Sequence, residues 1–227
     1  MLTIRIFNTP VKLSIKFLPI LVVLWGVVSW LGIYWHPGRT LWQGLLIGLI
    51  TSVVLLLAEL GHPLAHIFSA RRAGAPMDEI LITADMPRTI YKNNDIAPKA
   101  HRMRALGGPV YNLACILISL AIFEVSPHDS LLHELMAWSA FGHIMLLVMS
   151  LIPVPMVDGG SILKWTLVIR GRTERAADEL VRKVDWVLGV ILAITGLGML
   201  FVGWWVVGLI LLAVGGIVSG IAAKKNR

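Results

Sequence analysis

The sequence predicts an all-α polytopic membrane protein with about six transmembrane helices and a short β-like segment after the second span. Of its 227 residues, 57% are hydrophobic and only 15% are charged. Several apolar runs reach the roughly 20 residues that a helix needs to cross a bilayer. A soluble core could not use so much apolar surface, so we expect an integral membrane protein.

The length of each apolar run and its lack of charge define the spans. The first four are expected at residues 17–35, 41–69, 106–125 and 132–153. A short apolar piece follows at residues 162–169. The last apolar tract, residues 184–223, is too long for one span and breaks near Val202-Gly203, which gives two helices of about 20 residues each.

The distribution of Lys and Arg predicts the orientation. With a cytoplasmic N-terminus, the inside segments hold three basic residues before the first span, seven from Arg71 to Arg104, six from Lys164 to Lys183 and three at the tail; only Arg39 lies outside. We therefore expect both termini in the cytoplasm, in a prokaryotic plasma membrane. We attribute the net charge of +7 to the basic residues of the cytoplasmic loops rather than to a nucleic-acid-binding surface.

No internal repeat and no soluble domain is visible, which predicts one membrane-embedded domain over residues 1–227. Its core motifs span residues 54–163, and residues 184–223 form a two-helix C-terminal extension. The lone Cys115 excludes an intramolecular disulfide. The oligomeric state stays open.

The run Ala58-Glu59-Leu60-Gly61-His62 is one residue short of H-E-x-x-H, in which two histidines hold zinc and the glutamate acts as general base. An alanine occupies the first histidine position. By the predicted topology, Glu59 and His62 lie near the cytoplasmic end of the second span, at the depth of Asp158 after the fourth. Ionisable residues at membrane depth indicate function.

The chain resembles the site-2 protease family of intramembrane zinc metalloproteases. Four pieces match in the right order: Glu-Leu-Gly-His at 59–62, Ala-Arg-Arg-Ala-Gly at 70–74, Gly-Pro-Val-Tyr-Asn at 108–112, and Pro-Val-Pro-Met-Val-Asp-Gly-Gly at 153–160. They cover about half of the chain, and their joint match is far more specific than any single one.

The resemblance implies one zinc ion with His62 and Asp158 as ligands, Glu59 as the base and Asn112 as a polar group near the substrate. It also implies that the strand-like run 78–83 pairs with an unwound substrate. The expected partners are a transmembrane protein or peptide substrate and the lipid bilayer, with no nucleic acid. Besides Ala58, Ser150 departs from the family pattern, where asparagine is usual.

Loss of one histidine leaves two protein ligands, whereas catalytic zinc usually takes three. His66 lies four residues after His62 on nearly the same helical face. His62 and His66 could therefore bind the metal in place of the usual histidines at positions 58 and 62. Glu59 then either remains the base or joins the ligands. The alternatives are that His66 marks the membrane interface and that Glu59 and His62 form a buried polar pair.

Several other residues are expected to have structural roles. His143 is expected to form a hydrogen bond between helices, with metal ligation as the alternative. Gly107-Gly108-Pro109 is typical of a closely packed helix start, and Asn112 could join helices. His101, His128 and His133 are expected to have no specific role.

The leading hypothesis is thus a zinc metalloprotease that cleaves transmembrane segments near the cytoplasmic face. Ala58 motivates the alternative, a metal-free pseudoprotease that binds membrane proteins without cleaving them. A small transporter would explain the buried charges but not the ordered motifs, and no inverted repeat supports it.

Overall fold

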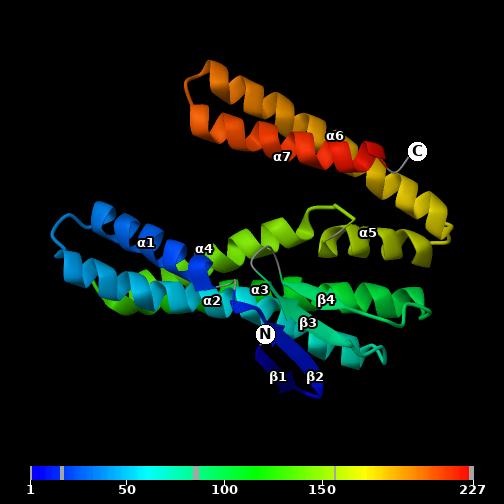
Figure 1. Ribbon diagram of the computed structural model, residues 1–227, viewed down its shortest axis with the longest axis horizontal. Coiled ribbons are helices and arrows are strands. Elements are labelled where there is room, and N and C mark those ends of the chain that lie inside the picture. The colour runs from blue at the N-terminus through cyan, green and yellow to red at the C-terminus, as the bar shows by residue number, and fades with distance from the viewer. Residues whose placement is uncertain (1, 16–17, 84–86, 156, 225–227) are drawn as a thin grey trace. The chain divides into compact units, whose positions relative to one another are not determined.

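A computed structural model describes residues 2–15, 18–83, 87–155 and 157–224, and its secondary structure is helical apart from one small sheet (Figure 1). The chain divides into two compact units, Met1–Ser150 and Leu151–Arg227. The described part holds seven helices and four strands.

The first unit contains four long helices: α1 (Leu18–Trp35), α2 (Leu41–Arg72), α3 (Pro98–Val125) and α4 (Leu131–Leu151). The side chains of Thr40 and Gln43 form a reciprocal capping box at the start of α2. Gly74, with φ of 68°, accompanies its end. With 32 residues, α2 is about 48 Å long and exceeds the roughly 30 Å hydrocarbon core of a bilayer. Helix α2 is therefore longer than an untilted crossing requires.

Helices α1 and α2 pack closely because glycines of α2 face α1. A Cβ at Gly44 would overlap the side chain of Ile33, and one at Gly48 would overlap Ser29. The indole Nε1 of Trp25 also donates a hydrogen bond of 2.8 Å to the Leu45 carbonyl. Small residues at a helix interface allow this close approach in a membrane, where lipid provides no hydrophobic drive for association.

The sheet has the order β1-β2-β3-β4, with β1 at Leu2–Ile6, β2 at Thr9–Leu13, β3 at Glu79–Ile82 and β4 at Arg88–Ile90. Strands β1 and β2 form a hairpin whose turn residues Phe7 and Asn8 both have positive φ, as tight hairpin turns require. Strand β2 pairs in parallel with β3, and β3 pairs antiparallel with β4.

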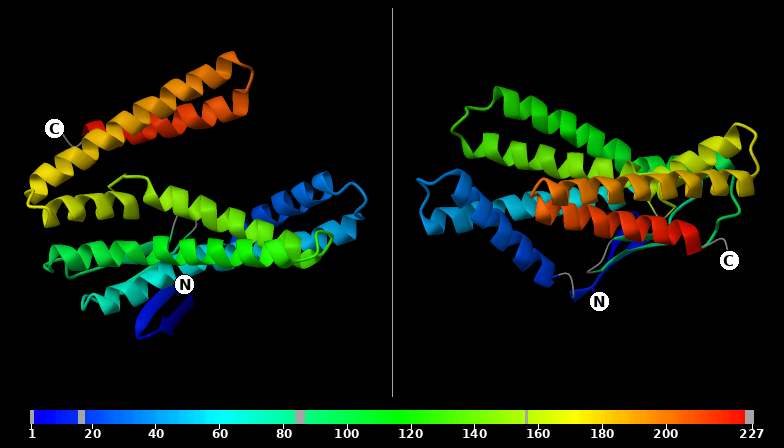
Figure 2. Two further views of the ribbon diagram at one scale, coloured as in Figure 1. Left: turned by 180° about the vertical axis from the view of Figure 1, so that it is seen from behind. Right: turned by 90° about the horizontal axis from the view of Figure 1, so that it is seen from above.

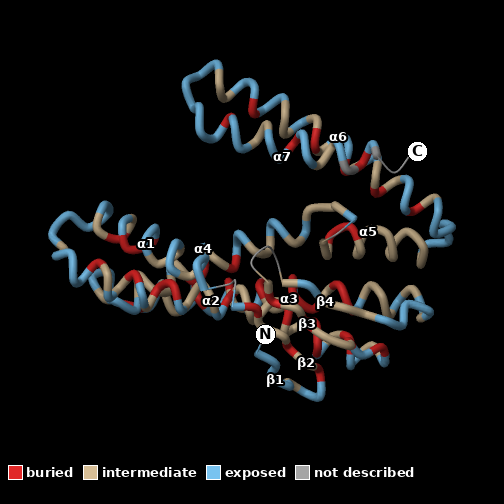
Figure 3. The backbone as a smooth tube through the Cα atoms, in the orientation of Figure 1, coloured by how far each residue is buried: buried red, intermediate tan, exposed pale blue. Residues whose placement is uncertain are grey.

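The sheet covers the C-terminal half of α2. Its buried Val11, Ile80 and Ile82 join Ile67 and Ala70 of α2 in one apolar cluster. Figure 3 shows buried segments gathered on α2, α3 and the strands beside them. The β-like segment predicted at residues 78–83 is therefore confirmed as β3, whereas β1, β2 and β4 were not predicted.

The predicted pairing of this segment with a substrate is wrong for β3 itself. Leu81 pairs with Lys12 on one side and with Arg88 on the other, so neighbouring strands occupy both edges of β3. In the described part of the sheet, the outer strands are β1 and β4.

The second unit contains α5 (Asp158–Ile169), α6 (Glu174–Phe201) and α7 (Trp205–Lys224). Helices α6 and α7 run side by side as a hairpin in both views of Figure 2. Their backbones approach closely: a Cβ at Gly189 would lie 2.6 Å from the Ser219 nitrogen, and one at Gly196 2.7 Å from the Leu212 nitrogen. The break predicted near Val202-Gly203 is confirmed, with Gly203 at φ of 84°.

Within the described ranges, five helices, α1 to α4 and α6, are long and apolar enough to cross a membrane. Helix α7, the expected sixth span, is apolar over the shorter stretch Trp205–Gly220. Large apolar side chains such as Trp30, Leu117 and Ile194 are exposed along these helices, as a lipid-facing surface requires. The fold class is confirmed as an all-α integral membrane protein with a small sheet.

Candidate metal centre

Two histidines of α2 bring ring nitrogens together. The Nε2 atoms of His62 and His66 lie 3.3 Å apart, and the rings meet edge to face with centroids separated by 5.0 Å. This arrangement follows from the sequence, because residues four apart share one face of a helix. His66 is buried and His62 is half-buried.

A carbonyl of α3 holds the His66 ring in place. The Nδ1 atom of His66 donates a hydrogen bond of 2.7 Å to the Arg104 carbonyl, which also accepts one of 3.1 Å from the Ser69 hydroxyl. A carbonyl only accepts, so Nδ1 of His66 carries a proton in this hydrogen bond.

The Arg104 side chain in turn fixes the start of α3. Its Nε donates to the Ala75 carbonyl at 2.8 Å, its Nη1 donates to the Asn93 carbonyl at 3.2 Å, and its guanidinium lies 4.2 Å from the centroid of the Tyr91 ring. Arg104 is 4% exposed. Arg104 thereby links the histidine site to the segment that precedes β3 and to the segment that follows β4.

Helices α3 and α4 hold the His62 ring. The Asn112 amide Nδ2 donates a hydrogen bond of 2.9 Å to Nδ1 of His62, and Nδ1 of His143 donates one of 3.1 Å to Oδ1 of Asn112. Both Asn112 and His143 are buried. The interhelical hydrogen bond expected of His143 is present.

Glycines make room for these contacts. A Cβ at Gly108 would overlap the His62 ring, one at Gly107 would lie 2.9 Å from Cα of His66, and one at Gly61 would overlap the Tyr111 side chain. The close packing predicted for the Gly107-Gly108 pair is therefore confirmed. It presses α3 directly against the histidine face of α2.

The histidine pair fits a zinc ion. Two imidazole nitrogens on a tetrahedral zinc, each about 2.05 Å from the metal, lie about 3.3 Å apart. The Nε2 atoms of His62 and His66 have this separation. Metal-ligating histidines usually donate their other ring N–H to an acceptor; His66 does so to the Arg104 carbonyl, whereas Nδ1 of His62 accepts from the Asn112 amide.

Glu59 lies one turn before His62 on α2 and is half-buried. Pro63 lacks the N–H that would bond to the Glu59 carbonyl, yet α2 continues through it without a break. Ala58 is 2% exposed, so the position of the absent histidine faces the protein interior.

In the second unit, Asp158 is the first residue of α5. A Cβ at Gly159 would overlap the Leu151 carbonyl, and one at Gly160 would overlap the Val154 carbonyl. The preceding loop therefore folds tightly over the first turn of α5, which explains the Gly-Gly pair after the aspartate. Ser150 donates a hydrogen bond of 3.1 Å to the Leu147 carbonyl of its own helix.

Of the predicted site residues, the structure thus joins His62, His66 and Asn112 in one hydrogen-bonded group, with Glu59 one turn away on the same helix. Sequence reasoning missed Arg104. The available signal was a basic residue just before a predicted apolar span.

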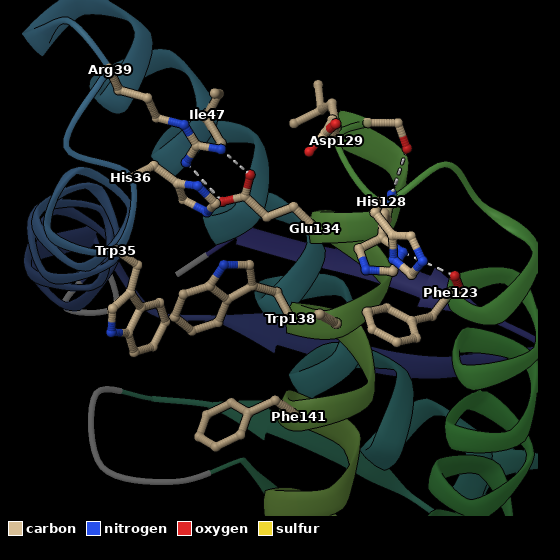
Figure 4. Close-up of a pocket in the computed structure, with 14 residues that line it drawn as sticks. Trp35, His36, Arg39, Ile47, Phe123, His128, Asp129, Glu134, Trp138 and Phe141 are labelled. Atoms are coloured by element: carbon tan, nitrogen blue, oxygen red, sulfur yellow. Dashed lines mark hydrogen bonds and ion pairs between the residues drawn. The ribbon is translucent and has the colours of Figure 1, made fainter.

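A separate cavity of about 640 Å³ lies among the ends of α1, α2, α3 and α4, and none of its lining residues belongs to the histidine site (Figure 4). The rings of Trp35 and Trp138 stack in its wall, and Arg39 donates a hydrogen bond of 2.9 Å to Glu134. His133, expected to have no specific role, lines this cavity and donates to the Phe123 carbonyl at 3.0 Å.

The membrane helices, the small sheet and the histidine pair define the class: a polytopic membrane protein with the site-2 protease fold. A solved structure, the site-2 protease from Methanocaldococcus jannaschii, matches with a TM-score of 0.55 and 20% identity, covering 100% of this chain and 96% of that one. This likeness shows the fold.

In sequence, the chain is 26% identical over 189 residues to proteins named "Putative zinc metalloprotease Rip3" from two strains of Mycobacterium tuberculosis, Erdman and H37Rv. The match covers 75% of this chain and 47% of the relative, so the chain spans about half the length of these relatives. No protein-family model matches. Together, the fold and the relatives confirm the resemblance to the site-2 protease family.

Proposed function

We propose that this protein is an intramembrane zinc metalloprotease that cleaves transmembrane segments near the cytoplasmic face. The observation that carries the proposal is the pair of Nε2 atoms of His62 and His66, 3.3 Å apart on the helix that also carries Glu59. The pair supplies the two imidazoles that the family signature provides, displaced by one helical turn.

His62, His66 and Asp158 would hold one zinc ion. Family resemblance supports Asp158, and the separation of the ring nitrogens supports the two histidines. Three protein ligands leave one coordination position open, as a catalytic site requires. When bound, zinc would polarise the scissile carbonyl and acidify the attacking water.

Glu59 would act as the general base. It keeps the three-residue spacing to His62 that the family signature has, and because His66 supplies the second imidazole, its carboxylate is not needed as a ligand. It would accept the proton of the attacking water and deliver it to the departing amine. Asn112 would act on the His62 ring, to which it is hydrogen-bonded, rather than on the substrate.

The charge distribution supports an orientation with both termini in the cytoplasm. The mycobacterial and archaeal relatives support a prokaryotic plasma membrane as the location. The substrate would be a transmembrane segment that unwinds near that face. Strand β4 (Arg88–Ile90) follows β3 in the chain and is an outer strand of the described sheet, so its edge could accept an extended substrate.

The test is proteolysis by the purified protein with zinc and a helix-destabilised transmembrane substrate. Glu59→Gln is the matched control, since it preserves size and removes the base. We expect product with the wild-type protein only. Equal amounts of product from both proteins would refute the assignment.

Zinc content separates this function from the metal-free pseudoprotease suggested by Ala58. We expect about one zinc ion per chain, lost in His62→Ala and in His66→Ala. Protein purified with zinc in the buffer that retains none would favour the pseudoprotease.

A further inference from the structure

The turn of the β1–β2 hairpin presents an aromatic residue to the outside. Phe7 has φ of 48°, and its side chain is 54% exposed. Two-residue hairpin turns with positive φ favour Gly, Asn and Asp, whereas a positive φ is unfavourable for a bulky residue. Phe7 therefore costs folding free energy and adds little to the core. A strained residue of this kind indicates that the exposed ring has a function.

The Phe7 ring lies against the C-terminal end of α2. Its centroid is 4.7 Å from that of Phe68, with the two rings edge to face, and 5.8 Å from the guanidinium carbon of Arg71. Phe68 is also 54% exposed. The contact holds the tip of the hairpin at the level of Phe68 on α2 and leaves both aromatic rings half-exposed.

Phe68 lies where α2 leaves the apolar part of the membrane. Val53, Leu57 and Phe68 are exposed and are separated by four and eleven residues, close to one and three turns of a helix, so they share one lipid-facing side. The next exposed residues of α2 are Arg71 and Arg72. A change from exposed apolar residues to arginines marks the membrane–water interface. The tip of the hairpin, which contacts Phe68, therefore lies at that interface.

Strand β1 exposes further apolar side chains, and Figure 3 shows it exposed along most of its length. Leu2 and Ile4 lie opposite Leu13 and Val11 in the hairpin. Residues directly opposite each other in an antiparallel pair share a sheet face, and Val11 packs this face on α2. Because β1 is an outer strand, the face remains open at Leu2 and Ile4, which are 60% and 52% exposed. Together with Phe7, the hairpin thus exposes three large apolar side chains.

The charge around these side chains is positive. The chain carries no acidic residue before Glu59, and Arg5 of β1 is exposed, as are Arg71 and Arg72 of α2. None of these three arginines forms an ion pair with a described residue. An anionic phospholipid surface attracts basic residues over a screening length of about 10 Å in 0.1 M salt. Exposed apolar side chains beside unpaired arginines are complementary to such a surface.

We propose that the β1–β2 hairpin and the end of α2 form a binding site for anionic phospholipid. The exposed apolar side chains of the hairpin reach the edge of the acyl chains together with Phe68, and Arg5, Arg71 and Arg72 bind lipid phosphate groups. A second copy of this chain is disfavoured as the occupant, because it would bring the same unpaired arginines against this surface. Bound lipid fixes the depth of the sheet and of the adjoining turns of α2, and it requires no zinc.

The depth of the hairpin can be measured in the whole chain, because Cys115 is its single cysteine. In a Cys115→Ser background, a nitroxide at Ile4→Cys reports on the hairpin, and one at Asp95→Cys reports on the exposed segment after β4 as a control. The protein is reconstituted into vesicles of phosphatidylcholine, alone or mixed with phosphatidylglycerol. Collisions of each label with oxygen, which concentrates in lipid, and with a water-soluble nickel chelate give its depth.

In the mixed vesicles, we expect the Ile4 label to collide mainly with oxygen and the Asp95 label mainly with the nickel chelate. Equal nickel collision rates for the two labels would overturn the proposal, as would equal insertion of the Ile4 label in both kinds of vesicle. Spin–spin broadening of the Ile4 label that disappears on dilution with unlabelled protein would identify a second copy as the occupant and would also overturn it.

Two variants test the groups that bind lipid. Phe7→Asn removes the ring and keeps the hairpin, since asparagine suits the positive φ of this turn. Arg71→Gln removes one charge, and Lys99→Gln, which removes an exposed charge of α3, is its control. We expect the ratio of inserted to water-exposed Ile4 label to fall about tenfold in Phe7→Asn and about fivefold in Arg71→Gln. Ratios equal to that of Lys99→Gln in both variants would refute lipid binding by these side chains.

Discussion

Substitution of Gly108 by alanine tests whether the position of the His62 ring matters for metal binding. The added Cβ would lie 2.7 Å from Cδ2 of His62, whereas carbon atoms in contact lie about 3.5–4.0 Å apart. The ring would have to move by about 1 Å. Metal sites tolerate deviations of only about 0.2 Å in ligand distance, so His62 would leave its position beside His66. We expect zinc affinity to fall about a hundredfold, which corresponds to about 2.7 kcal/mol.

The assay is a competitive titration of detergent-solubilised protein against a chromogenic zinc chelator, with the melting temperature recorded in parallel. Gly26→Ala is the control, because nothing lies within 4 Å of the Cβ that it adds to α1. Gly108→Ala should also lose about 1–3 kcal/mol of stability through overpacking. A folded Gly108→Ala protein with the zinc affinity of Gly26→Ala would refute the geometric argument.

Three further predictions concern residues of α2, α3 and α5. Adding Ala58→His to the His66→Ala variant should restore the zinc that His66→Ala loses, because positions 58 and 62 are also one turn apart; equal zinc contents of the single and double variants would contradict this. Arg104→Leu should lower stability by about 2–4 kcal/mol, since two charge-assisted hydrogen bonds to backbone carbonyls are lost, and an unchanged melting temperature would argue against their importance. Gly159→Ala should displace the loop over α5 and reduce both zinc affinity and cleavage, because its Cβ meets the Leu151 backbone rather than a flexible side chain; wild-type values for both would disprove this.

The membrane helices could be predicted from the sequence because each depends on a local property, the length of an apolar run. The sheet could be predicted only in part. Strand β3 was recognised from its own residues, but β2 (Thr9–Leu13) is fixed by parallel pairing with a strand beyond two helices. The alternation of apolar and polar residues in Val11-Lys12-Leu13 was the available signal, and the basic residues were interpreted only as a flank of the first span.

The histidine site could also be predicted only in part. The pairing of His62 with His66 follows from a spacing of four residues and was foreseen as one alternative. The contact of Asn112 with the His62 ring and the role of the Arg104 carbonyl depend on how α3 packs on α2, which no local spacing encodes. Gly108 permits that approach, and the sequence indicated only that the packing there was close.

The parallel pairing of β2 with β3 also constrains membrane insertion. Val11 and Ile80 lie opposite each other in the sheet, and the chain between them forms α1 and α2. Two segments that share backbone hydrogen bonds must lie on one side of the bilayer, so the intervening chain crosses it an even number of times. Roughly 70 residues separate the strands, and at a synthesis rate of about 5–20 residues per second β2 waits about 4–14 seconds for its partner. During that interval the N-terminal hairpin has an unpaired edge, and the completed pairing then secures the orientation of the first two helices.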